Sequence, residues 1–133
     1  MEKLEHIGIA VKDMSTANRL FAGLLGREHY KIEEVESEGV RTSFFEIAGV
    51  KIELLQATHA DSPIAKFIEK RGEGIHHLAF AVNDINKSIS EYENKGFEKI
   101  NKEPKRGADN KMICFLHPKS TNGVLIELCQ DIK

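Results

Sequence analysis

Two histidines and two glutamates occupy equivalent places in two stretches of the chain that read alike. His6 opens the run HIGIAVKD (residues 6–13), and His77 opens HLAFAVND (residues 77–84), 71 positions later. Glu53 lies within VKIELLQ (residues 50–56), and Glu127 lies within VLIELCQ (residues 124–130), 74 positions later. Two matches in the same order and at nearly the same offset indicate a duplicated module of about sixty residues.

The four side chains form a donor set that suits a divalent first-row metal ion. Imidazole nitrogens and carboxylate oxygens favour cobalt, nickel, zinc, manganese or iron over calcium. Taken singly, each residue has an ordinary explanation, because a histidine that opens a strand is commonly half-exposed and a glutamate between apolar residues commonly faces solvent. The recurrence of all four at equivalent positions favours the metal. If a pseudo-twofold axis relates the copies, His6, Glu53, His77 and Glu127 converge on that axis.

Each copy is predicted to fold as a β-α-β-β-β module, which makes the fold class α+β. Residues 4–11 and 76–82 are β-rich runs that begin the two copies. Two further strands follow each helix, or three if the short segment after the helix is counted. They cover residues 40–47 and 50–56 in the first copy and residues 112–117 and 124–130 in the second. The polar stretch 101–111 is predicted to be a loop.

One helix is predicted within each copy and one between the copies. The first helix has the apolar stripe Ala17, Leu20, Phe21 and Leu24 and ends at Gly26. The helix between the copies begins at Ser62 and Pro63 and has the stripe Ile64, Phe67 and Ile68. The helix of the second copy is capped by Asp84, has the stripe Ile85, Ile89 and Tyr92, and ends at Gly96. The chain then divides, within one domain, into module 1 (about 1–60), a linker helix (about 61–73) and module 2 (about 74–133).

A hairpin around Ala48-Gly49 predicts which side chains share a face with Glu53. If these two residues form the turn, Phe44 lies opposite Glu53, and Glu46 falls on the same face because side chains alternate with period two. Glu46 is therefore a candidate second carboxylate on the metal side. The alternative is a surface ion pair between Glu46 and Lys51 across the hairpin.

Composition limits the partners and the compartment. The 133 residues include 19 Lys and Arg against 21 Asp and Glu, a net charge of −2, so there is no electrostatic basis for nucleic-acid binding. No apolar run approaches the ~18 residues of a membrane span, and the first residues lack the apolar stretch of a signal peptide. Cys114 and Cys129 lie in apolar strand-like segments and are expected to be buried, reduced thiols. We expect a cytoplasmic protein without membrane or nucleic-acid partners.

With its paired βαβββ modules, each carrying a His and a Glu, the chain resembles the vicinal oxygen chelate (glyoxalase/bleomycin resistance/dioxygenase) superfamily. Four segments look more narrowly like the methylmalonyl-CoA epimerases: DSPIAKFI (61–68), GIHHLAF (74–80), EPK (103–105) and LHPKSTNGVLIEL (116–128). Glyoxalase I shares the fold and the ligand pattern. A glyoxalase I-type lyase and a non-catalytic small-molecule-binding member therefore stand as alternatives.

The resemblance implies one half-closed barrel around a metal, often cobalt, with zinc, nickel or manganese as other choices. His6, His77 and Glu127 match the family's ligands, and Glu53 matches a fourth. The substrate would be the (R) and (S) forms of methylmalonyl-CoA, epimerised through an enolate that the metal stabilises. The resemblance also implies a homodimer.

Inversion needs one base on each face of the enolate. Glu127 is the candidate for one base and Glu46 for the other, although Glu46 departs from the family's pattern. Cations near the second module are candidates for the phosphates of coenzyme A: Lys105, Arg106, Lys111 and Lys119.

Overall fold

A computed structural model describes residues 1–133. Its elements in chain order are β1 (Lys3–Ala10), α1 (Met14–Leu25), β2 (Lys31–Val35), η1 (Glu36–Glu38), β3 (Val40–Ile47), β4 (Val50–Ala57), α2 (Pro63–Arg71), β5 (Gly74–Ala81), α3 (Ile85–Asn94), β6 (Lys105–Arg106), β7 (Lys111–Leu116), η2 (Pro118–Ser120) and β8 (Ile126–Asp131). The chain forms two compact units, one of residues 6–76 and one of residues 1–5 with 77–133. No helix is both long and apolar enough to cross a membrane.

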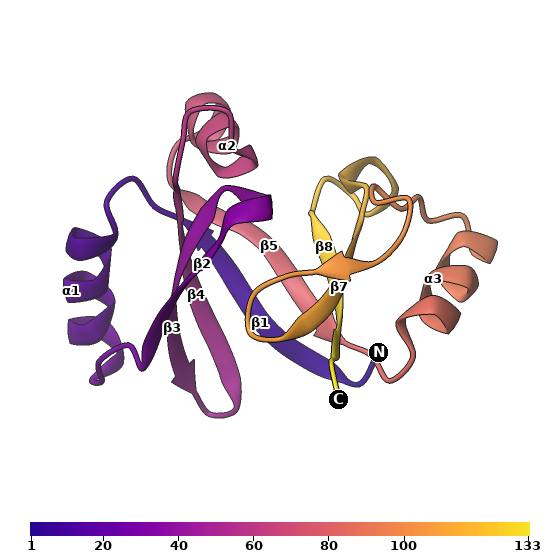
Figure 1. The fold of residues 1–133 in the computed structure, drawn as a ribbon, viewed down its shortest axis with the longest axis horizontal. Helices are drawn as coiled ribbons and strands as arrows, with labels where there is room; N and C mark the ends of the chain where they lie inside the picture. The colour runs from indigo at the N-terminus through magenta and orange to yellow at the C-terminus, as the bar shows by residue number, and fades with distance from the viewer. The chain divides into compact units, whose positions relative to one another are not determined.

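In the unit of residues 6–76, β2, β3 and β4 form an antiparallel run, and β1 lies parallel to β4. Helix α1 lies beside β3 and β4 (Figure 1). Its Ala17, Phe21 and Leu25 pack on Phe45 and Leu54 of the sheet. These contacts place α1 on the face of the sheet opposite Glu53.

The predicted stripe on α1 is wrong at two positions. Leu20 is 61% exposed and Leu24 is 71% exposed, whereas Met14 at the start of the helix is buried. The stripe that packs runs through Met14, Ala17, Phe21 and Leu25, because the helix begins directly after its N-cap at Asp13 and turns this side toward β3 and β4.

The hairpin between β3 and β4 confirms the predicted register. Phe44 pairs with Glu53, and Glu46 pairs with Lys51. The turn residues Ala48 and Gly49 have φ values of 50° and 84°, the left-handed pair that a two-residue hairpin of matching twist requires.

Helix α2 begins and packs as predicted. The Ser62 hydroxyl accepts a hydrogen bond from the Ala65 N–H, and Pro63 occupies the first turn. Ile64, with Phe67 and Ile68 beside it, packs on a buried group from the sheet that consists of Ala10, Val40 and Leu55.

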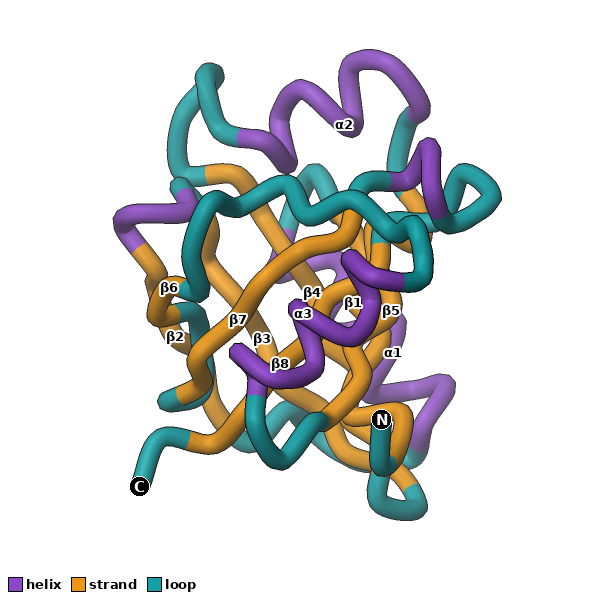
Figure 2. Tube along the Cα trace, turned by 90° about the vertical axis from the view of Figure 1, so that its right-hand side faces the viewer, coloured by secondary structure: helices purple, strands orange, loops and turns teal.

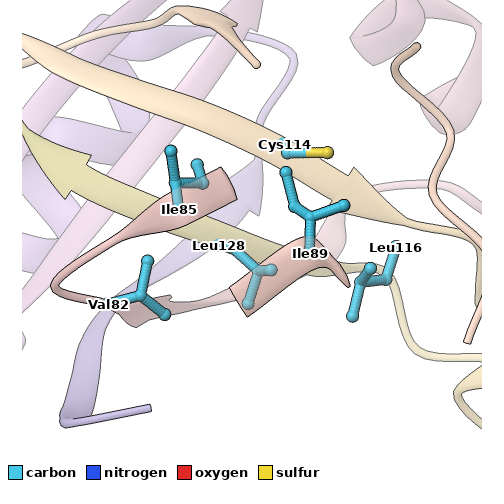
Figure 3. Close-up of a cluster of buried hydrophobic side chains, with 6 residues drawn as sticks. All are labelled: Val82, Ile85, Ile89, Cys114, Leu116 and Leu128. Carbon is cyan, nitrogen blue, oxygen red and sulfur yellow. The ribbon is translucent and has the colours of Figure 1, made fainter. Parts of the chain in front are cut away.

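The second unit repeats this plan with β5 parallel to β8, and with β7 antiparallel to both β8 and β6. Helix α3 lies across β7 and β8 (Figure 2). Its stripe is confirmed at Ile85 and Ile89, with Tyr92 packed beside them. Figure 3 shows the core between the helix and the strands, made of Val82, Ile85, Ile89, Cys114, Leu116 and Leu128. Cys114 and Cys129 are buried free thiols, as predicted.

Equivalent hydrogen bonds join the helix to the last strand in both modules. The Met14 N–H donates to Gln56 Oε1 at 2.6 Å, and the Ile85 N–H donates to Gln130 Oε1 at 2.7 Å. Asp13 caps the start of α1, and Asp84, 71 positions later, caps the start of α3. The duplication and the α+β class, with two βαβββ modules, are therefore confirmed.

The strand edges of module 2 depart from the prediction. The stretch 101–111 is not all loop, because β6 pairs with β7 within it and Lys111 is the first residue of β7. Strand β8 begins at Ile126, two residues later than predicted. A strand of two residues has too little side-chain alternation to be found by pattern.

Candidate functional site

In the unit of residues 6–76, His6 and Glu53 form a buried pair. His6 Nδ1 lies 3.1 Å from Glu53 Oε2, and the two side chains are 6% and 5% exposed. Their strands set this contact, because β1 and β4 are parallel and Glu53 pairs with Gly8, two residues after His6. The two-residue step keeps His6 on the face of Gly8 and brings its imidazole to the carboxylate.

In the other unit, His77 and Glu127 form the equivalent pair. His77 Nε2 lies 3.2 Å from Glu127 Oε1, and both side chains are 6% exposed. Strands β5 and β8 are parallel, and Glu127 pairs with Ala79, again two residues after the histidine. The register that produces the first pair is therefore repeated in the second.

The donor chemistry and spacing of each pair fit the coordination of a divalent metal ion. Histidine nitrogens and carboxylate oxygens bind such ions at about 2.0–2.2 Å, so two ligands on one ion lie about 3.0–3.4 Å apart. The distances of 3.1 and 3.2 Å fall within that span. Burial adds to the fit, because a buried carboxylate must be paired or bound to a metal.

Glu46 lies in register on the face of Glu53, yet its surroundings differ from those of the two pairs. Thr42 and Phe44, on the same face of β3, are buried, whereas Glu46 is exposed. The Glu46 backbone carbonyl accepts a hydrogen bond of 3.0 Å from Arg27 Nη1. Glu46 thus stands at the hairpin end of the strand, on the predicted face.

The cations proposed for coenzyme A fall into two groups. Lys105 and Arg106 form β6, and Lys119 is exposed in η2. Lys111 is different: its side chain is 12% exposed, and its ammonium group contacts the carboxylates of Asp131 and Glu5. Lys111 therefore belongs to a local ion-pair network at the start of β7.

His76, the residue before His77, packs against a helix and not against a His–Glu pair. His76 makes an edge-to-face contact with Phe67 of α2, with ring centroids 4.9 Å apart. Burial lowers the pKa of His76 to about 4, so the ring is neutral at neutral pH.

Three residues near the His–Glu pairs were not predicted from the sequence. The Phe115 ring lies edge-on to His77, with centroids 5.7 Å apart. Gln56 and Gln130, each three residues after a pair glutamate, fix the starts of α1 and α3. Both glutamines belong to the repeated motif, so their recurrence at equivalent positions could have indicated a shared structural role. Phe115 also had a repeat partner, Phe44, 71 positions earlier.

Comparison with known proteins identifies the family of this chain. The family model for the glyoxalase/bleomycin resistance protein/dioxygenase superfamily matches residues 5–115. The ethylmalonyl-CoA/methylmalonyl-CoA epimerase of Cereibacter sphaeroides is 38% identical over 130 residues, covering 96% of this chain and 97% of that protein.

Two solved structures share the fold over almost the whole chain. A variant of the Streptomyces coelicolor methylmalonyl-CoA epimerase in complex with 2-nitronate-propionyl-CoA has a TM-score of 0.94 and 34% identity, covering 98% of this chain and 95% of that one. A methylmalonyl-CoA epimerase in complex with methylmalonyl-CoA and NH4+ has a TM-score of 0.93 at 34% identity, with the same coverage. The chain therefore belongs to the glyoxalase/bleomycin resistance protein/dioxygenase superfamily and, within it, to the family of the methylmalonyl-CoA epimerases, which are isomerases.

Proposed function

We propose that this enzyme interconverts the (R) and (S) forms of methylmalonyl-CoA. The observation that carries the proposal is the repeated, buried His–Glu pair, found in a chain of the epimerase family. The α-hydrogen of this substrate lies between a thioester and a carboxylate, so its removal leaves an enolate. An enzyme for this reaction needs to stabilise the enolate and to reach both of its faces with a base.

His6, Glu53, His77 and Glu127 together would hold one divalent metal ion, cobalt first and zinc, nickel or manganese as alternatives. The ion would supply Lewis-acid stabilisation of the negative charge on the enolate oxygens. The repeat supports a shared site, because each module contributes one nitrogen and one oxygen and two donors alone make a poor site.

Glu127 would also act as a base on one face of the substrate: it would take the α-proton from one epimer and, in the reverse direction, deliver a proton to the same face of the enolate formed from the other epimer. Its burial keeps bulk water away from the carboxylate, so that proton transfer to the substrate does not compete with solvent. We propose Glu46 as the base for the other face, since it is the acidic residue on β3 that shares the face of Glu53. Its exposure leaves it open to solvent, so a proton that it receives can exchange with water.

The phosphates of coenzyme A would bind beside module 2, at Lys105, Arg106 and Lys119. The edge strands of the two modules support this choice through their charges. Lys105 pairs with Ile113 of β7, and the equivalent pair in module 1 is Glu33 with Thr42.

Equivalence follows because Thr42 and Ile113 lie 71 positions apart, the offset of the repeat. At the next step along each edge, Arg106 stands where module 1 has Glu34. In module 1 the two glutamates are balanced by ion pairs with Lys31 and Arg41. The module 2 edge carries two cations at these positions, and they would attract an anionic ligand.

Reversing the charge of both Lys105 and Arg106 to glutamate should raise the KM for methylmalonyl-CoA about tenfold, a loss of about 1.4 kcal/mol of binding. We expect kcat to change little, because the phosphates lie far from the reacting carbon and bind equally well before and during the reaction. Steady-state kinetics at low salt measure both constants. The matched control is the double variant Lys12→Glu with Arg19→Glu, which makes the same charge change on exposed residues of module 1; an equal rise in KM there would contradict a local role.

We also propose, from the family resemblance, that the protein is a homodimer in the cytoplasm. Within each subunit, module 1 (about 1–60), the linker helix (about 61–73) and module 2 (about 74–133) would act as one domain. Light scattering coupled to size-exclusion chromatography measures the dimer directly.

The proposed activity is tested by incubating the purified, cobalt-loaded protein with one epimer of methylmalonyl-CoA in heavy water. We expect inversion at the α-carbon together with uptake of deuterium. Absence of both would reject the epimerase. A parallel assay with methylglyoxal and a thiol detects a glyoxalase-type isomerase, and ligand binding without turnover in either assay would indicate a non-catalytic member of the superfamily.

A further inference from the structure

The side chain of Asn101 hydrogen-bonds to the edge of β7, at the point where the chain after Ile100 turns away from the sheet. The Ile100 N–H donates to the Phe115 carbonyl at 2.8 Å. The Phe115 N–H in turn donates to Asn101 Oδ1, also at 2.8 Å. One backbone group of Phe115 is thus satisfied by the neighbouring backbone and the other by a side chain.

In module 1, strand β2 (Lys31–Val35) begins directly after the equivalent residue, Tyr30. The Tyr30 N–H donates to the Phe44 carbonyl at 2.9 Å, which is the equivalent of the bond from Ile100. Strand β2 follows at once, and Glu33, three positions after Tyr30, pairs with Thr42. Here the backbone of β2 itself provides the partners for β3.

Module 2 carries two extra residues at the same place. Lys105, the equivalent of Glu33, comes five positions after Ile100 rather than three. Residues 102–104 therefore leave the edge before β6 rejoins it, in the manner of a bulge. The Asn101 amide oxygen takes the place of the backbone carbonyl that the departure removes.

The position of Phe115 links this edge to the His–Glu pair. Since its N–H and carbonyl face residues 100 and 101, its pairing with Glu127 on the other side is of the type without direct hydrogen bonds, in which opposed side chains lie closest. Its ring meets the His77 ring at 88°, with centroids 5.7 Å apart. Edge-to-face contacts of this kind favour one mutual orientation of the rings.

We propose that Asn101 is a positioning residue, which fixes Phe115 on β7 so that the Phe115 ring holds the His77 imidazole in the orientation that meets Glu127. The catalytic meaning of this role rests on the proposed function. The orientation of His77 is a property of the folded chain and can be measured without activity. Loss of the Asn101 acceptor leaves the Phe115 N–H without its partner, and the strand must shift to find another.

The test compares Asn101→Leu, which keeps the branched shape but has no acceptor, with Asn101→Asp, which keeps the acceptor. The His77 ring signals are followed by NMR in the metal-free and zinc-loaded protein, and they are assigned by their loss in His77→Gln. We expect the His77 signals to move in Asn101→Leu and to return to near the wild-type positions in Asn101→Asp. The signals of His29, which packs on Phe45, should stay in place in both variants.

Kinetics give the second readout. In Asn101→Leu we expect kcat to fall about tenfold to a hundredfold, as small displacements of catalytic groups do, with KM little changed and with recovery in Asn101→Asp. The matched control is Asn83→Leu, which removes a bond from another asparagine of the same unit, that from Asn83 Nδ2 to Glu2. It should leave both readouts at wild-type values.

Unmoved His77 signals in a folded Asn101→Leu protein would overturn the proposal. If that variant does not fold, Asn101→Ala serves instead, since it also removes the acceptor and keeps the Phe115 ring. His77 signals that stay in place there would overturn the proposal equally. If the wild type shows no epimerase activity, the NMR comparison still decides the role of Asn101, so the two proposals fail separately.

Discussion

Replacing Glu127 with glutamine is expected to reduce kcat for methylmalonyl-CoA epimerisation by at least about a thousandfold, because it removes a proposed base and a proposed metal ligand at once. Glutamine has almost the same size and can still accept a hydrogen bond at 3.2 Å from the His77 ring. The substitution therefore changes the chemistry of the side chain while the packing of β8 against β7 is retained.

The measurement is the rate of deuterium uptake at the α-carbon, beside a thermal unfolding curve. We expect uptake to be lost with little change in the unfolding midpoint. Glu91→Gln is the matched control, since Glu91 is an exposed residue of α3 in the same unit; it should keep full activity. Near-normal uptake in Glu127→Gln would mean that this carboxylate is neither the base nor a necessary ligand.

The two His–Glu pairs could be predicted from the sequence because the two copies of the motif constrain each other. A strand register is set by the period of two, and a slip of one residue would turn every side chain to the other face. The motif around His6 and the motif around Glu53 recur together, so a register that joins one pair must join the other. The structure bears this out, with each histidine two residues before the strand partner of its glutamate.

The sequence could not predict features that depend on one module alone. The rotation of α1 was wrong at Leu20 and Leu24, because several apolar residues compete for the stripe and tertiary packing chooses among them. The contact of Lys111 with Asp131 and Glu5 joins residues that are far apart in sequence. The role of Asn101 depends on an insertion, which has no counterpart in module 1 to reveal it.

Removing the metal should have an effect as large as the Glu127 substitution, and it distinguishes one shared ion from two separate ones. We expect dialysis against a strong chelator to reduce the epimerase activity below about one thousandth, and added cobalt to restore it. The unfolding midpoint should rise again with the ion, because a ligand that binds only the folded protein stabilises it. Activity that survives complete removal of metal, verified by elemental analysis, would exclude the proposed role of the ion.

The stoichiometry of reloading then decides how the two pairs work together. If His6, Glu53, His77 and Glu127 hold one ion, the wild type binds one cobalt per chain, and the double variant His6→Gln with Glu53→Gln loses it almost completely although the His77–Glu127 pair is intact. If each pair held its own ion, the wild type would bind two and the double variant would keep one. His29→Gln changes a histidine of the same unit that packs against Phe45, and it should leave the cobalt content unchanged. A shared ion predicts that either module alone is inadequate, since two donors give too few bonds to hold it.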